Sequence, residues 1–190
     1  MDASNHLCAD FEDYNSGVNH PITGVGTITV DSIWHHVAAT YDQPSGIWNL
    51  YIDGVLDQTL TISGTDLVRT PRYDSIQKAG IAVAMDSAAT VEGRFAGVID
   101  EVRIWNKALP QATIQSNRNL ESPSDTTGLI GHWSMNEGSG SSISDSAGPT
   151  TYETGTSAGS PAWFLASIRQ SLLHLPPHRP STRHLTVQQV

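Results

Sequence analysis

Alternating apolar and polar positions dominate the middle of the chain and predict β-strands there. Over residues 48–52 the apolar side chains recur at every second position, the spacing of a strand with one buried face. Residues 34–41 carry apolar side chains on both faces, as expected where both sides of a strand are covered. The sequence of residues 42–46 favours a turn, and Asp53-Gly54 predicts a type I′ hairpin turn. The pattern therefore predicts an antiparallel meander through residues 34–62.

The same alternation, more weakly, predicts further strands on both sides of this meander. They cover residues 5–11, 27–30, 80–85, 94–105 and 128–135. One short helix is expected near 110–119, where Pro110 suits the first helical turn. Abundant Gly, Ser, Thr, Asn and Asp agree with many turns. The sequence thus predicts an all-β, antiparallel fold with a single short helix.

Charge changes this picture at the end of the chain. The net charge is −9, which argues against a nucleic-acid partner because no basic patch is present to meet phosphates. Residues 167–190 differ from the rest: they contain Arg169, Arg179 and Arg183, several prolines and no acid. We expect this basic tail to be unpacked. No apolar run reaches the ~20 residues of a membrane-spanning helix, and no export signal is recognisable at the N-terminus.

Asp100 is the most informative polar position, because apolar residues surround it on its strand. A buried carboxylate costs several kcal/mol unless it is paired or coordinated. Two explanations remain open: a calcium ligand, or a carboxylate that accepts hydrogen bonds from the backbone or an arginine, which we favour. Glu101 and Arg103 should face the other way as a surface ion pair. Because Asp100 and Glu101 point to opposite faces, they do not form the carboxylate pair of a glycosidase.

Other reactive or aromatic residues have simpler explanations. The rings of His35 and His36 should point apart on a strand and so serve packing instead of sharing a metal ion. The single cysteine, Cys8, is expected to be a small buried hydrophobe. The strand aromatics are expected mostly in the core. No serine-protease triad, P-loop or Cys/His cluster is readable in the sequence.

Three stretches in a fixed order carry a family resemblance: residues 33–42, 50–55 and 95–106. Together they resemble the laminin-G-like (LamG) jelly-roll domains of the concanavalin A-like lectin/glucanase superfamily, most closely the tandem bacterial members. The resemblance covers roughly residues 2–120. It implies a jelly-roll β-sandwich, a structural calcium held by an acid such as Asp100, and an extracellular or cell-surface location in the parent protein.

The resemblance also suggests how the chain is divided. Residues 1–120 correspond to one LamG-like jelly roll that lacks its first strands, so the sandwich is expected to be incomplete. Residues 121–127 are a linker. Residues 128–166 resemble the start of a second repeat, or else supply a strand that completes the first. Residues 167–190 form the basic tail, and the chain as a whole resembles a fragment of a bacterial tandem-repeat surface protein.

The sequence predicts the fold of the chain more clearly than its function. The first interpretation is a non-catalytic extracellular module that binds carbohydrate or another matrix ligand, either with or without the assistance of calcium. The second is a structural or adhesion repeat of a surface protein with no ligand of its own. Sugar recognition in the superfamily usually involves loops, which makes the loops at 12–24, 63–78 and 86–93 the candidates. Their candidate ligand-binding residues are Tyr14, Asn15, Arg72, Tyr73 and Asp74.

Overall fold

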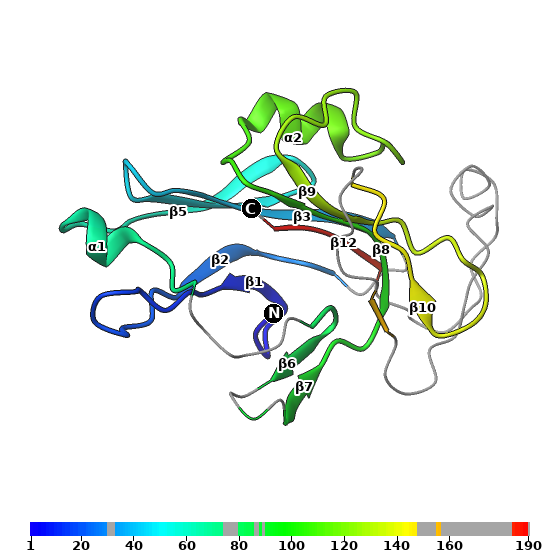
Figure 1. The fold of residues 1–190 in the computed structure, drawn as a ribbon, viewed down its shortest axis with the longest axis horizontal. Coiled ribbons are helices and arrows are strands. Elements are labelled where there is room, and N and C mark those ends of the chain that lie inside the picture. The colour runs from blue at the N-terminus through cyan, green and yellow to red at the C-terminus, as the bar shows by residue number, and fades with distance from the viewer. Residues whose placement is uncertain are drawn as a thin grey trace.

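The computed structural model describes residues 1–29, 33–73, 80–85, 88, 90–147, 155–156 and 184–189. Twelve strands and two short helices are formed by this part of the chain (Figure 1). The strands are β1 His6–Ala9, β2 Ile22–Thr27, β3 Trp34–Asp42, β4 Ile47–Ile52, β5 Val55–Thr61, β6 Val83–Met85, β7 Val91–Arg94, β8 Val98–Trp105, β9 Leu129–Trp133, β10 Ser142–Ile143, β11 Gly155–Thr156 and β12 His184–Gln189. The helices are α1 Asp66–Arg69 and α2 Gln111–Asn117.

One six-stranded sheet organises the fold, with the strand order β5-β4-β3-β12-β8-β9. Its pairs are antiparallel except those of β12, which runs parallel to both β3 and β8. Three two-stranded sheets accompany it: β1-β2, β6-β7 and β10-β11. The predicted all-β sandwich is confirmed, and so is the short helix near 110–119.

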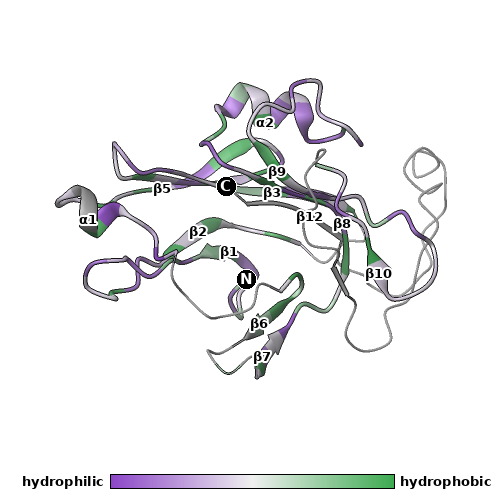
Figure 2. Ribbon diagram, viewed as in Figure 1, coloured by the Kyte–Doolittle hydropathy of each residue, from purple (hydrophilic) through white to green (hydrophobic). Residues whose placement is uncertain are grey.

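The large sheet has a layer on each face (Figure 1). One face carries a buried cluster that includes Leu109, just before α2, and Ile114, within α2. These two residues pack with Tyr51, Trp105 and Leu129. On the other face, β1 and β2 cover a second cluster: Ile22, Trp48, Leu50 and Ile62, with Leu7, Ala9 and Phe11 at its margin. Figure 2 shows apolar residues along β2 and β8 and hydrophilic ones in the neighbouring loops. The core thus lies on both sides of one sheet, as in a sandwich.

The turn between β4 and β5 forms as the sequence predicts. Asp53 and Gly54 both have positive φ, 53° and 77°, which is the backbone of a type I′ turn. The Asp53 carboxylate accepts hydrogen bonds from the backbone N–H of His36, at 2.9 Å, and binds Nδ1 of His35, at 2.8 Å. The turn is therefore tied to the start of β3 as well as to its own hairpin.

Bulges break the strict alternation that the sequence suggests. Glu101 has φ 57° in the middle of β8, and the pairing of β8 with β12 shifts register between Asp100 and Arg103. A similar shift lies between β4 and β5. There the Asp57 carboxylate accepts a hydrogen bond from the Gly26 backbone N–H at 2.7 Å, while Leu56 is exposed. Beyond a bulge, sequence parity no longer tells which face a residue occupies.

Several local predictions differ from the structure. The strand expected at 27–30 forms earlier, as β2, and the long strand expected at 94–105 divides into β7 and β8, because residues 95–97 interrupt it. Cys8 is exposed and not buried. None of the helices in the described ranges is long and apolar enough to cross a membrane.

The two segments after residue 127 also join the fold. β9, at the start of the expected second repeat, pairs antiparallel with β8 and forms an edge of the main sheet. We expected the tail 167–190 to be unpacked, whereas residues 184–189 form β12 inside the same sheet. Backbone pairing with two neighbours explains this placement, since an uncharged, partly β-branched segment suits a strand.

Candidate ligand-binding site

Two loops that are far apart in the sequence are joined by backbone hydrogen bonds. The N–H of Tyr14 donates to the carbonyl of Thr70 at 2.8 Å, and the N–H of Arg72 donates to the carbonyl of Glu12 at 2.8 Å. Asp13 and Pro71 face each other as an isolated antiparallel bridge. The first predicted loop is therefore laid alongside the residues that follow α1.

A buried carboxylate fixes the shape of the first loop. Asp13 is fully buried and accepts hydrogen bonds from the N–H of Ser16, at 2.6 Å, and from its hydroxyl, at 2.7 Å. Its other carboxylate contact is Nε2 of His20, at 3.2 Å. The hydrogen bonds from Ser16 lower the pKa of Asp13 from 3.8 to about 2, so the carboxylate is ionised at neutral pH. An ionised acceptor with several donors holds the loop in one conformation.

The joined loops bring two tyrosine rings together at the surface. Tyr14 and Tyr73 are stacked, with ring centroids 4.7 Å apart and an angle of 7° between their planes. Tyr14 is 37% exposed and Tyr73 is 75% exposed. In the same two segments, the Arg72 guanidinium forms an ion pair with the Glu12 carboxylate. The joined loops thus carry an exposed aromatic pair together with a charged donor and acceptor, which we call the tyrosine platform (Tyr14, Tyr73, Arg72 and Glu12).

The predicted ligand-binding residues fall into three groups. Tyr14, Arg72 and Tyr73 come together in the tyrosine platform, and Asn15 is exposed in the turn that follows Tyr14. Asp74 lies outside the described residues. Sequence analysis did not single out Glu12, whose partner is 60 residues away. A charge opposite Arg72 could have been found only with knowledge of the loop pairing.

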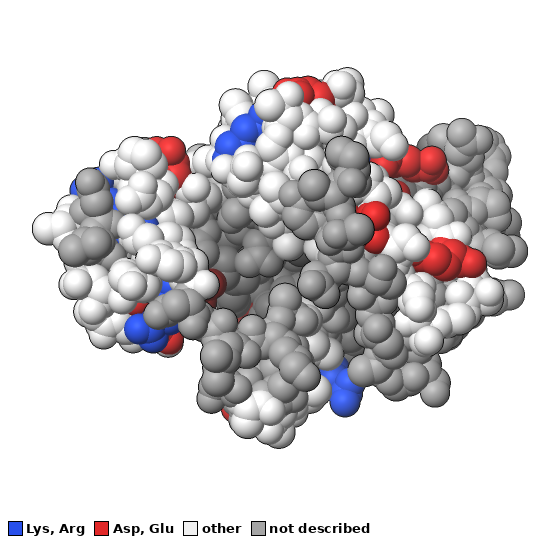
Figure 3. All heavy atoms as spheres, viewed as in Figure 1, with Lys and Arg blue, Asp and Glu red and all other residues white. Residues whose placement is uncertain are grey.

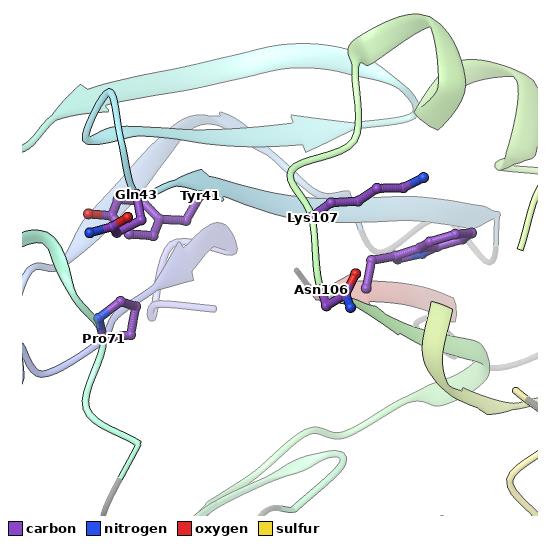
Figure 4. Close-up of a pocket in the computed structure, with 6 residues that line it drawn as sticks. Tyr41, Gln43, Pro71, Asn106 and Lys107 are labelled. Carbon is purple, nitrogen blue, oxygen red and sulfur yellow. The ribbon is translucent and has the colours of Figure 1, made fainter. Parts of the chain in front are cut away.

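A cavity lies at the ends of β3 and β8, and Pro71, which precedes Arg72 in the sequence, is part of its lining (Figure 4). Its volume is about 240 Å³, and its other lining residues come from the ends of these two strands and the segments just beyond them: Tyr41, Gln43, Trp105, Asn106 and Lys107. The Tyr41 hydroxyl donates to the Arg69 carbonyl at 2.6 Å, and burial raises its pKa. The Lys107 ammonium lies 5.9 Å from the centre of the Trp105 ring. The cavity therefore separates the ends of the two strands.

Asp100, the predicted calcium ligand, lies on β8 and is 8% exposed. Calcium takes six to eight oxygen ligands. Among the described residues, no three His, Cys, Asp or Glu side chains are grouped closely enough to hold a metal ion. A calcium ion at Asp100 would therefore need most of its ligands from backbone carbonyls and water, so this site stays a prediction.

The expected Glu101–Arg103 ion pair forms, but in the interior and not at the surface. Arg103 donates to Oε2 of Glu101 at 2.6 Å, and the two side chains are 0% and 1% exposed. The Arg103 guanidinium also donates to the carbonyls of Asn117 and Leu120, at the end of α2. Our expectation of a surface pair was wrong, because α2 and β9 cover this stretch of β8.

The same network includes a serine and a histidine. Nε2 of His132 lies 2.9 Å from Oε2 of Glu101, and the Ser146 hydroxyl lies 3.0 Å from Nδ1 of the same ring. This order resembles a Ser-His-Glu triad, which the sequence did not reveal. Here, however, the Glu101 oxygen already pairs with Arg103, and Ser146 also donates to the His132 carbonyl at 3.2 Å. We therefore assign this network to holding β9 and α2 on β8.

The remaining candidates serve packing. Trp48, Trp105 and Tyr51 are buried, as predicted for strand aromatics. His36 is buried on β3, and His35 binds the Asp53 carboxylate of the hairpin turn. Within the part of the chain that the structure describes, the tyrosine platform is thus where exposed aromatic rings gather. On the face in Figure 3, acidic side chains are dispersed and basic ones are few.

Two known proteins are similar to part of the chain. Over 119 residues the chain is 30% identical to the Sushi, von Willebrand factor type A, EGF and pentraxin domain-containing protein 1 of Rattus norvegicus, a match covering 55% of this chain and 3% of that protein. It is 27% identical over 112 residues to the neuronal pentraxin receptor of Mus musculus, covering 56% of this chain and 21% of that one. The chain therefore spans only a small part of these relatives.

A solved structure is also similar at low identity. It is an S-layer domain-containing protein from Clostridium thermocellum, 20% identical, with a TM-score of 0.37 and coverage of 61% of this chain and 64% of that one. The family profile described as the concanavalin A-like lectin/glucanases superfamily, in its laminin-G form, matches residues 2–115. The chain therefore belongs to the laminin-G-like branch of the concanavalin A-like lectin/glucanase superfamily.

Proposed function

We propose that this chain is an extracellular, non-catalytic module that binds carbohydrate, and that the tyrosine platform is its binding surface. The observation that carries the proposal is the stacked, exposed pair of Tyr14 and Tyr73. Exposing this much aromatic surface costs solvation free energy, and the flat apolar faces of pyranose rings are suited to cover it. Polar groups nearby would fix the orientation of the bound sugar through hydrogen bonds.

The charged pair of the platform agrees with a neutral, hydroxyl-rich ligand. Arg72 offers donors and Glu12 offers acceptors, and each sugar hydroxyl is both a donor and an acceptor. The two side chains are 38% and 40% exposed, so they are reachable from solvent without the cost of exposing a buried charge. A strongly charged ligand would disrupt their ion pair, whereas hydroxyl groups add hydrogen bonds to it.

The rigidity of the loop supports binding at this place. Asp13 anchors the turn that carries Tyr14, and backbone hydrogen bonds hold that turn to the segment that carries Tyr73. A site formed before the ligand arrives loses less conformational entropy on binding. Calcium is a separate proposal that depends on Asp100 and not on the platform.

A glycan array with the full chain tests the proposal. The chain without substitutions should bind a defined set of glycans, and the double variant Tyr14→Ala/Tyr73→Ala should lose that binding. Val55→Ser is a matched control, because Val55 is an apolar side chain that is 60% exposed on β5. The proposal fails if the unsubstituted chain binds no glycan, or if the double variant binds as well as that chain does. Either result favours the structural-repeat interpretation.

A further inference from the structure

The centre of the main sheet contains a slot one strand wide. β3 pairs with β4 on one side and β8 pairs with β9 on the other, but β3 and β8 do not pair with each other. Because neighbouring strands lie about 4.8 Å apart, the two are separated by about two such spacings. β12 occupies the space between them.

The occupant is held along its whole length by backbone pairing on both sides. His184 to Gln189 pair in register with Trp34 to Ala39 of β3. On the other side the same segment, except Val187, pairs with Val98 to Ile104 of β8, with one register shift at the bulge. Both ladders are parallel. In peptide binding by strand addition, main-chain hydrogen bonds of this kind give affinity, and the alternate side chains of the added strand give specificity.

An empty slot would be costly at this position. Val37 and Ala38, which border it, pack into two buried clusters formed with residues outside β12, so this part of β3 is covered by neighbouring layers. Backbone N–H and C=O groups that are buried without partners destabilise a fold. β3 and β8 can therefore belong to one sheet only if a strand fills the slot between them.

The slot continues beyond the end of β12. Gln189 pairs with Ala39 and Ile104, and the cavity of about 240 Å³ lies further along, between Tyr41 and Trp105 (Figure 4). The two strands thus stay apart past the last paired residue of the occupant. Tyr41 and Trp105 lie at the C-terminal ends of β3 and β8. The separation is therefore a feature of the two strands themselves and extends past the stretch that β12 fills.

The sequence of the occupant suits a central strand. The register sets Val187 opposite Val37, and Leu185 opposite Ile99. The segment has no acid, no proline and no glycine, as suits a central strand. In the sequence, residues 157–183 separate it from the preceding strand β11.

We propose that the space between β3 and β8 is a strand-acceptor site, and that its ligand is an extended peptide with the sequence of residues 184–189. The site binds this segment parallel to both neighbours. Because the ligand is joined only through a long connection, the same segment supplied as a separate peptide binds there when the chain's own copy is displaced.

A proline substitution in the full chain tests the proposal. Thr186→Pro removes a backbone donor and is incompatible with a central strand, so it should vacate the slot. Hydrogen exchange of the β3 and β8 amides should become at least about tenfold faster, as loss of one to two hydrogen bonds implies. Ser181→Pro, before the strand begins, is the control and should leave this exchange unchanged.

Peptide capture provides the second measurement. A fluorescent peptide with the sequence of residues 183–190 should bind Thr186→Pro and restore slow exchange there, and it should not bind the Ser181→Pro control. A variant that unfolds should be refolded by the same peptide. The proposal is overturned if exchange is unchanged in Thr186→Pro, if the peptide neither binds nor restores protection, or if a scrambled peptide acts equally well.

Discussion

Glu101 and Arg103, two residues apart on β8, form an ion pair of 2.6 Å that is removed from solvent. The positive φ of Glu101 places the bulge of β8 at this pair. Arg103 reaches the last carbonyls around α2, and Glu101 reaches His132 on β9. The pair therefore connects the helix layer and the edge strand to the centre of the sheet.

Removing one member of this pair should destabilise the protein strongly. In Arg103→Met the Glu101 carboxylate remains buried without its cation, which costs about 3–5 kcal/mol in comparable pairs. Urea unfolding measures the change, and Arg103→Met/Glu101→Gln should recover part of the loss. The exposed pair of Lys107 and Asp125, 3.8 Å apart, is the matched control: Lys107→Ala should cost less than about 1 kcal/mol. Equal effects at both pairs would contradict this account.

Gly54→Ala should destabilise the hairpin between β4 and β5. Gly54 has φ 77°, and an added Cβ would lie 2.8 Å from Cγ and 3.1 Å from Cα of Gln115. The left-handed backbone alone costs an alanine about 1–2 kcal/mol. Gly93→Ala, whose nearest neighbour would be 3.6 Å away, should change the free energy of unfolding by less than about 1 kcal/mol. Thermal unfolding compares the two variants, and a larger loss at Gly93 would refute the prediction.

Asp13 should make the stability of the first loop depend on acid pH. Its folded pKa of about 2 lies below its ordinary value of 3.8, so its contribution is complete above pH 4 and is lost as the pH falls through 2. Asp13→Asn should therefore lower Tm at pH 6 and differ little from the parent near pH 2. Ser16→Ala should raise the Asp13 pKa, as followed by carboxyl NMR. A Tm difference that persists undiminished at pH 2 would be inconsistent with this assignment.

Calcium dependence is the prediction attached to Asp100. If calcium binds there, Tm should be higher in calcium than in EDTA, because a ligand of the folded state stabilises it by RT ln(1 + [L]/Kd). Asp100→Asn should abolish that rise. An unchanged Tm of the parent protein in calcium and in EDTA would exclude a structural role for the ion.

Local sequence signals predicted local structure well in this chain. Asp53-Gly54 forms the expected turn, the strand expected at residues 34–41 forms over 34–42, and α2 lies within the expected range. Each of these depends on neighbouring residues alone. The burial of Glu101 and Arg103 could not be predicted, because it depends on α2 and β9, which reach β8 only in the folded chain.

The candidate site shows the same limit. Tyr14 and Tyr73 were both singled out from their loops, but their stacking depends on how those loops pair. That pairing rests on Asp13, whose burial is not evident from a polar loop sequence. The exposure of Leu56 has a related cause: a bulge shifts the register of β4 and β5, and bulges have no reliable sequence signal.

The most direct test of carbohydrate binding is isothermal titration calorimetry with the strongest array ligand. Tyr73→Ala should weaken Kd by at least about tenfold, which corresponds to loss of about 1.4 kcal/mol at a central aromatic contact. Tyr73→Phe, which retains the ring, should stay within a few-fold of the parent, as should Val55→Ser. A Kd that is unchanged by Tyr73→Ala would show that the tyrosine platform is not the binding surface.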